Sequence, residues 1–426
     1  MKTKFIGMAA LAAMFSLGFT ACSNNEEIGG AEVAQARDAI GFNISADGMK
    51  ASTRGLATNS GSIIFTDFQA WGYDAVDGGL YMGASATSGV TVTNTAGVWG
   101  YTPTQFWPVN ALNFVAIAPA ASAEITGNSV AQDGTSKVLT LTSAISLDTD
   151  VEDQDDIMFA ASRTADVTTP APALGAYGPV AKGDHDGDVP LNFQHALSQI
   201  VFKGKLPANG MVTEVEIAEI SLGNIPSEGS LTFTSAGAFY GGNATITPTA
   251  STEAVFSLDA GDLEDANWGV GGTNDTYSNA TAGTAFDLTI SNSASKPTAK
   301  PGNAWFMLPQ ALTAWEYRAD PSAPATAADK AKLKAGGLWN GVDANVEPAS
   351  GAYMKVRATL KKNGVTILGN AESDAVYIPI GDTWERGKKY IYTIEFNGTG
   401  ALTPITFSVT AVDWTDASPQ PDELSF

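Results

Sequence analysis

Very few side chains in this sequence can carry acid–base or nucleophilic chemistry at neutral pH. The 426 residues include two histidines, His185 and His195, and one cysteine, Cys22. Histidine is the side chain whose ordinary pKa lies closest to neutrality, so these two positions are the main candidates for proton transfer. Ser198 follows His195 by three residues, and in a strand this spacing places the two side chains on opposite faces. The sequence therefore predicts no Ser–His pair, and we expect His195 to be a packed residue of a core or sheet edge.

The Asp and Glu residues do not indicate a metal site or a catalytic site either. Asp184, Asp186 and Asp188 surround His185, and clustered oxygen ligands are what calcium prefers. The run lacks the spaced ligands and the terminal Glu of a calcium loop, so we interpret it as a solvated acidic turn. Glycoside hydrolysis needs two carboxylates, and no particular pair stands out. We predict that the protein is not an enzyme and has no metal site and no cofactor.

Cys22 is predicted to be a lipidation site. Lys2 and Lys4 precede an apolar run over residues 5–21, which is the pattern of a secretory signal and is too weak for a permanent membrane helix. The end of the run, Phe19-Thr20-Ala21-Cys22, resembles a bacterial lipobox, in which the cysteine is acylated, for example with palmitate. The alternative is an ordinary signal peptide with a cysteine nearby. We predict a signal peptide over residues 1–21 and a lipidated tether over 22–37 that holds the protein at the outer membrane.

Charge and composition exclude some partners. The formal net charge is −22, and removal of Lys2 and Lys4 with the signal makes it more negative by two. Nucleic acid and anionic lipid both require basic side chains, so neither is an expected partner. Hydrophobic residues make up 44% of the chain, which is enough for a buried core, and the length favours two domains.

The elements that must position these residues are predicted to be strands. Short runs alternate between apolar and polar residues, for example Leu139 to Thr142 and Ile405 to Thr410, and this period of two is typical of half-buried strands. One segment, Ala327 to Ala335, reads as a helix closed by two glycines. We predict an all-β protein with one domain over residues 38–188, ending in a linker or long loop over 164–188, and a second domain over 189–426.

The chain has nine tryptophans, and exposed tryptophan rings could form a surface that binds sugars. Those within strand patterns, Trp71, Trp99, Trp107 and Trp414, are expected to be core residues. Three others lie in or beside Gly- or Ala-rich loops and are candidates for an exposed aromatic platform: Trp268, Trp315 and Trp339.

Several blocks of the sequence resemble the fimbrillin family of the Bacteroidetes. They run in family order over roughly residues 40–415 and are Gly100–Pro108, Leu112–Pro119, Asp156–Ala160, Leu191–Ser198, Met307–Gln310 and Ile378–Ile394. The resemblance implies two tandem transthyretin-like β-sandwich domains and a structural role in the pilus, or fimbrium. It also implies a lipoprotein precursor that reaches the cell surface, is cut by a maturation protease and assembles with other pilus subunits of the same or a different kind by β-strand exchange, supporting cell adhesion.

The resemblance places the cut after Arg54, before Gly55, in a run of small residues of the kind that proteases reach. The strand released by this cut would be Ala39 to Ile44. Arg37 is a competing cut site, but cleavage there would leave the strand in place. The alternative is that Arg54 is a solvated surface arginine.

By the same reasoning the strand donated to the next subunit is C-terminal. Four apolar residues alternate there with Thr and Ser and would form one face: Ile405, Phe407, Val409 and Ala411. The alternative is an ordinary final strand of the second domain. For the whole protein, the alternative to a polymerising subunit is a surface lipoprotein or tip adhesin that binds a glycan or host ligand.

Overall fold

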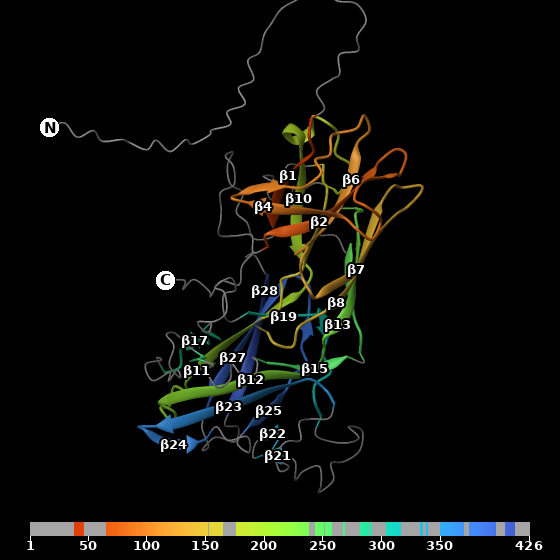
Figure 1. Ribbon diagram of the computed structural model, residues 1–426. Helices are drawn as coiled ribbons and strands as arrows, with labels where there is room; N and C mark the ends of the chain where they lie inside the picture. Colours follow the sequence, from red (N-terminus) through yellow and green to blue (C-terminus); the bar gives the residue numbers. More distant parts are fainter. Residues whose placement is uncertain are drawn as a thin grey trace, which may run out of the picture. The chain divides into compact units, whose positions relative to one another are not determined.

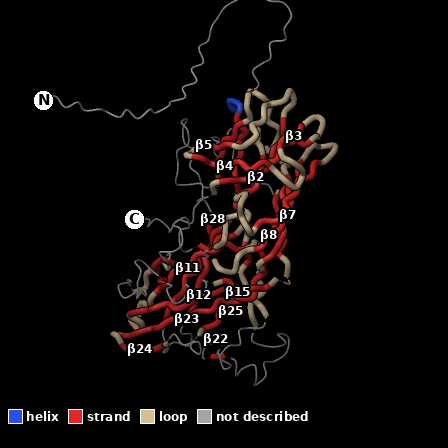
Figure 2. The backbone as a smooth tube through the Cα atoms, viewed as in Figure 1, coloured by secondary structure: helices blue, strands red, loops and turns tan. Residues whose placement is uncertain are grey.

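Strands account for nearly all of the regular structure (Figures 1 and 2). The computed structural model describes residues 38–46, 65–151, 153–164, 176–237, 243–250, 252–257, 267–268, 282–288, 290–291, 304–316, 333–334, 338–339, 350–369, 375–397 and 405–413. Within these ranges the one helical element is a single 3-10 turn, η1 (Asp184–Gly187). None of the described residues lies in a helix that could cross a membrane. The all-β prediction is confirmed.

The described strands form four main sheets and three two-stranded ribbons. The first sheet has eight strands, β1 (Gly41–Ala46), β10 (Asp188–His195), β9 (Met158–Ala161), β6 (Leu112–Ala118), β2 (Asp67–Asp74), β4 (Val90–Thr95) and β5 (Val98–Gly100) in that order, with β3 (Leu80–Met82) beside β2. The second has the order β14 (Ala244–Pro248), β13 (Glu228–Thr234), β8 (Leu139–Ser146) and β7 (Ile125–Gln132).

The other two main sheets contain the C-terminal strands. The third has the order β17 (Ala285–Asp287), β11 (Ser198–Lys205), β27 (Lys388–Phe396) and β28 (Ile405–Asp413), with β19 (Ala304–Met307) also on β11. The fourth has the order β15 (Glu253–Phe256), β12 (Glu214–Pro226), β23 (Tyr353–Lys362) and β24 (Val365–Leu368), with β25 (Val376–Pro379) on β23. The ribbons pair β16 (Asn267–Trp268) with β18 (Ile290–Ser291), β20 (Gln310–Ala311) with β26 (Thr383–Trp384), and β21 (Leu333–Lys334) with β22 (Leu338–Trp339).

Local sequence explains why these segments are strands. Along β8, Leu139 and Leu141 are buried while Thr142 is exposed, as expected for a sheet with one face in a core. The turn from β23 to β24 is Asn363-Gly364, and both residues have positive φ, at 50° and 80°. A tight hairpin turn of the right twist requires two positive φ angles, which Asn and Gly adopt most readily.

The first sheet is apolar on both faces. One face, with Trp71 and Phe159, belongs to a large core cluster that also contains the inward side chains of the second sheet, such as Leu141. The opposite face, with Phe68 and Phe114, belongs to a separate cluster.

β1 helps to enclose this second cluster. It pairs in parallel with β10, and Ala39, just before it, forms an antiparallel bridge with Phe106, which follows β5 in the chain. This bridge brings together the two edges of the first sheet, the one formed by β1 and the one formed by β5. β1 therefore closes the sheet on itself.

Strand pairs join residues on both sides of the predicted domain boundary at 188/189. β10 begins at Asp188 and pairs with β1 and β9, while β13 pairs with β8. The chain then continues from β10 into β11 of the third sheet, with only Ala196 and Leu197 between them. The division into two domains stays a prediction.

Two local expectations need correction. Leu333 and Lys334, inside the predicted helix, form strand β21, and the rest of that segment lies outside the described residues. In the predicted linker, Tyr177 and Val180 are buried, and Val180 bridges to Leu112. Tertiary contacts decided both outcomes, since neither short segment has a periodic pattern strong enough to reveal its partner.

Candidate functional site

The predicted site residues fall into two groups. Cys22, Arg54, Gly55 and the competing Arg37 lie outside the described residues. The predicted leaving strand is described as β1 with its approach, residues 38–46, and the predicted donor is described as β28. The described residues resume at Phe65, so the chain passes through Arg54 between β1 and β2.

β1 and the residue two positions before Phe42 insert three alternate side chains into the second core cluster. Ile40, Phe42 and Ile44 are 2%, 7% and 6% exposed. The Phe42 ring meets three other aromatic rings edge-on, with centroid distances of 5.5 Å to Phe68, 5.8 Å to Tyr101 and 6.0 Å to Phe114. Edge-to-face packing of this kind adds to the free energy of area burial. The pocket for residue 42 is therefore built for an aromatic ring.

Main-chain hydrogen bonds hold β1 against β10 on one side and hold the residues just before β1 on the other side. Its parallel register with β10 places Phe42 opposite Val189 and Ile44 opposite Leu191. On the other side the Ile40 N–H donates to the Gln105 carbonyl at 2.9 Å, and the Trp107 N–H donates to the Asp38 carbonyl at 2.9 Å. β1 thus occupies a groove between β10 and the segment Gln105–Trp107, which we call the β1 groove.

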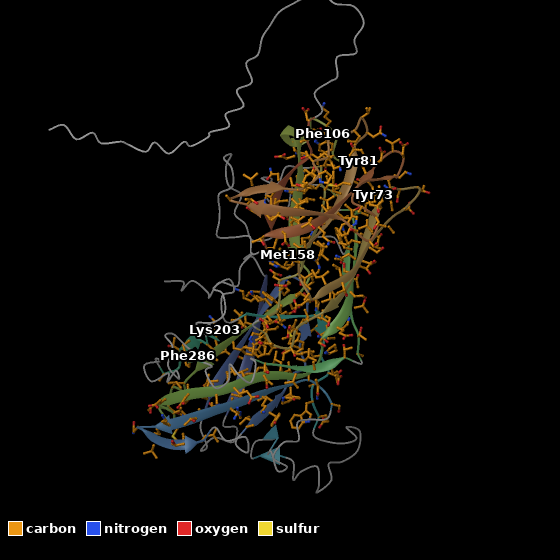
Figure 3. The ribbon with its side chains drawn as sticks, in the orientation of Figure 1. Tyr73, Tyr81, Phe106, Met158, Lys203 and Phe286 are labelled. Carbon is orange, nitrogen blue, oxygen red and sulfur yellow. The ribbon has the colours of Figure 1, made fainter. Side chains whose placement is uncertain are left out.

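Polar side chains line both ends of the β1 groove. At its start, the Tyr101 hydroxyl donates to the Ile40 carbonyl at 2.9 Å, and burial raises the pKa of Tyr101, which keeps this hydroxyl protonated. At its other end, the Asn192 amide donates to Ser45 Oγ at 2.6 Å, and Asn192 is 7% exposed. The Tyr81 hydroxyl also donates to the Phe106 carbonyl, and Figure 3 shows these two residues side by side.

Among the described strands, β28 lies at the edge of the third sheet and pairs with β27 alone over Ile405–Asp413. Its predicted apolar face does point to the core. Ile405 is 1% exposed, while Phe407 and Val409 are half-buried against the large cluster, and the Phe407 ring lies 5.7 Å from that of Tyr392. Ala411 is exposed. The alternation was predicted correctly, but burial declines toward the end of the strand.

His195 is buried, as the sequence predicted. Its Nδ1 lies 2.9 Å from Asp156 Oδ2, and both side chains are fully buried where β10 leads into β11. Burial raises the pKa of Asp156, and the attraction of His195 offsets only part of this effect. Ser198 is directed elsewhere, since its hydroxyl donates to the Glu385 carbonyl at 2.9 Å.

The tryptophans are mostly core residues. Trp71 and Trp107 are buried and Trp99 is half-buried, as expected for strand positions. Trp315 is 7% exposed and packs in a small cluster with Tyr353 and Tyr377, so the prediction of an exposed platform is wrong at this position. Neither the side chains of Trp268 and Trp339 nor any part of Trp414 is among the described residues.

Sequence reasoning found β1 and β28 but not the residues that hold β1. The Gly100–Pro108 block stands out in the sequence by its family resemblance, yet nothing local shows that Tyr101 and Gln105 bind the chain at Ile40. Asn192 was likewise hidden inside an apolar run. Taken together, the β1 groove can bind an extended peptide with a central aromatic side chain, and no described residue gives it catalytic chemistry.

Comparison with known proteins gives one match over most of the sequence. The model of the family described as fimbrillin-like matches residues 77–414. No curated protein matches the chain.

Solved structures of low similarity also align over most of the chain. A fimbrial protein from Bacteroides vulgatus has 16% identity and a TM-score of 0.48, with 88% of this chain and 99% of that chain covered. The fimbrial anchor protein Mfa2 from Porphyromonas gingivalis has 11% identity and a TM-score of 0.29, with 89% of this chain and 99% of that chain covered.

Proposed function

This chain belongs to the fimbrillin-like family, and from that membership we propose that it is a structural subunit of a surface pilus, or fimbrium. The subunit is exported as a precursor that carries lipid on Cys22 and rests at the outer membrane. A maturation protease cuts between Arg54 and Gly55, and the trimmed subunit joins other pilus subunits by strand exchange. Its two predicted domains, 38–188 and 189–426, form the body of the subunit.

The observation that supports this proposal most strongly is the way in which β1 is attached to the rest of the subunit. Its apolar side chains, among them Phe42 and Ile44, fill a cluster whose other members come from residues 65–193. Its covalent link to those members runs through the segment that contains Arg54. A cut after Arg54 would therefore leave β1 held by noncovalent contacts alone.

If β1 left the subunit, another strand would have to cover the surface that β1 covers. The main-chain groups of β10 that face β1, and the apolar cluster beneath, would become exposed, and an unpaired apolar sheet edge readily pairs with another strand. β28 is suited to this role because it is itself an edge strand with one apolar face. Strand addition draws affinity from main-chain hydrogen bonds and specificity from alternate side chains. The lipid on Cys22 would leave with β1, so it serves transport rather than the finished fibre.

An arginine-specific protease tests the proposal. Treatment of the precursor should give one product that begins at Gly55, identified by N-terminal sequencing, and this product should form oligomers whose size grows with concentration. The matched control is Arg54→Lys, which keeps the charge but is not a substrate for such a protease. It should remain a monomer under the same conditions.

Two results would contradict the proposal. One is an intact Arg54–Gly55 bond under conditions that cut other exposed arginines. The other is a product that begins at Gly55, has lost residues 22–54 and stays monomeric at every concentration.

A further inference from the structure

One end of the first sheet, which we call the entry end, is where the chain enters the sheet. β1 and β10 begin there, because they pair in parallel with Gly41 opposite Asp188. β6 also begins there and β2 ends there, since Leu112 lies opposite Asp74 in their antiparallel pair. β1 ends and β2 begins at the opposite end. The segment that contains Arg54 therefore joins the sheet away from the entry end.

Three large apolar side chains are exposed at the entry end. Val76, in the turn after β2, is 63% exposed. Phe106 and Val109 lie in the loop before β6, where Phe106 is 41% exposed and Val109 is fully exposed. Single exposed apolar residues are common on proteins. Several of them at one place, on neighbouring loops, indicate a surface that contacts a protein or a membrane.

Hydrogen bonds fix the turn after β2 against the loop before β6. The Ala75 N–H donates to the Ala111 carbonyl at 2.9 Å. The Asn110 amide donates to Asp74 Oδ2, also at 2.9 Å. The buried ring of Trp107 anchors the loop from the inside. The backbone that carries the three apolar side chains is therefore already ordered, and binding costs little additional entropy there.

The predicted lipid tether joins the fold at this same end. The described residues begin at Asp38, and Ala39 forms a bridge with Phe106. Cys22 lies 16 positions before Asp38 (22 to 38). An extended chain spans at most about 3.6 Å per residue, so a lipid on Cys22 keeps the entry end within about 60 Å of the membrane. A tether makes a second contact intramolecular, and a contact too weak to hold a free protein is then sufficient.

The charge at the entry end decides which lipids it can meet. Exposed carboxylates lie there on Asp38, Asp77, Asp184 and Asp188. Lys182 pairs with one of them, Asp38, at 3.4 Å. These carboxylates would be repelled by anionic headgroups. Headgroups without net charge, such as phosphatidylcholine, accept apolar side chains without this repulsion.

We propose that the entry end of the uncut precursor rests on the membrane surface, with Val76, Phe106 and Val109 inserted among lipids that carry no net charge. This inference rests on the proposed function, because the lipid on Cys22 supplies the tether. The membrane contact would be a second, weaker attachment beside the lipid, and it would give the precursor a fixed orientation.

This orientation distinguishes the two arginines at which the precursor can be cut. Arg37 directly precedes Asp38, at the entry end, and the membrane contact shields it. The segment that contains Arg54 joins β1 and β2 at the opposite end of the sheet, away from the membrane. The contact therefore leaves Arg54 open to the maturation protease and protects the site whose cleavage would keep β1 in place.

Hydrogen exchange of the tethered chain tests the membrane contact. The uncut chain that begins at Cys22 is coupled through this thiol, the only one in the sequence, to a maleimide lipid in phosphatidylcholine vesicles. The same chain capped with a soluble maleimide is the reference. Amides in residues 74–79 and 104–111 should exchange about threefold more slowly on the vesicles. Addition of phosphatidylglycerol to the vesicles should reduce this protection.

Two pairs of valine substitutions give a matched comparison. Val76→Ser with Val109→Ser should remove most of the protection, because it deletes two of the three apolar contacts. Val98→Ser with Val365→Ser should leave the protection unchanged. These control valines are 62% and 66% exposed, but Val98 lies at the opposite end of the first sheet and Val365 in the fourth sheet. Urea denaturation of both variants checks that they fold.

An arginine-specific protease gives a second measurement of the orientation. On phosphatidylcholine vesicles, initial cleavage after Arg37 should be slower than in the soluble reference, while cleavage after Arg54 keeps its rate. The variant with Val76→Ser and Val109→Ser should regain cleavage after Arg37, which separates the membrane contact from the effect of the tether alone.

Protection confined to the entry end and lost only in the variant of Val76 and Val109 would support the inference. Equal exchange with and without vesicles, equal effects of the two valine variants, or slower cleavage after Arg54 would overturn it. These results do not depend on strand exchange or on acylation in the cell, because the lipid is attached chemically. A cell-made precursor without lipid on Cys22, identified by mass spectrometry, would instead overturn the proposed function, and the membrane contact in the cell would fall with it.

Discussion

Replacing Phe42 with alanine should weaken the hold of β1 on the rest of the subunit. The ring is 7% exposed and meets three aromatic neighbours edge-on. Removal of a buried phenylalanine side chain costs about 3–5 kcal/mol of folding free energy. We expect a cost near the lower limit of this range, because β1 lies at the edge of the sheet and the surrounding side chains can relax into the cavity. The free energy of unfolding of the uncut precursor should therefore fall by about 3 kcal/mol.

After cleavage the same loss acts on β1 as a bound peptide. Each 1.4 kcal/mol changes an equilibrium constant about tenfold, so the dissociation constant of the nicked fragment should rise about a hundredfold. Urea denaturation of the uncut chain and size-exclusion chromatography of the nicked chain measure the two effects. Asn43→Ala is the matched control, since Asn43 lies on the same strand outside the apolar cluster and its replacement should change stability by less than about 0.5 kcal/mol. A loss below about 1 kcal/mol for Phe42→Ala, or equal retention of the fragment in both variants, would refute the reasoning.

Two further predictions concern buried charges. The pKa of Asp156 is raised above its ordinary value of 3.8 in the folded state, so the folded chain binds more protons at this carboxyl than the unfolded chain does. The stability that this group contributes is therefore present at low pH and is lost as the pH rises through the folded-state pKa. Unfolding of the wild type and of Asp156→Asn, measured from pH 4 to 7, should therefore show a downward slope that the variant lacks, and parallel curves would contradict the assignment. Glu219 accepts from Lys355 Nζ at 3.2 Å with both side chains nearly buried, so Glu219→Ala should cost roughly 3 kcal/mol in urea denaturation. The more exposed pair of Glu214 and Lys361, at 2.6 Å, gives the comparison, and Glu214→Ala should cost less than about 1 kcal/mol; equal losses would show that burial is not the deciding factor.

Local patterns in the sequence were sufficient to predict strands, because a period of two is a property of consecutive residues. Leu139 and Leu141 face the core while Thr142 faces solvent, as the alternation required. The same alternation in Ile405, Phe407 and Val409 identified the apolar face of β28. The burial of His195 followed from its apolar surroundings, but its partner Asp156 did not, since 39 positions separate them.

The sequence by itself determined the strand-rich class, the lack of a recognisable catalytic motif and the alternation of apolar and polar residues in two segments, residues 39–44 and 405–411. Only the tertiary structure decided where the first segment lies, because pairing between Phe42 and Val189 joins distant parts of the chain that no local pattern connects. It also decided that Trp315 is packed in a cluster rather than exposed. Alternation shows which face of a strand is apolar. The neighbour that covers this face depends on how distant segments pack together, and that packing places the apolar side chains of β1 in one cluster with residues 65–193.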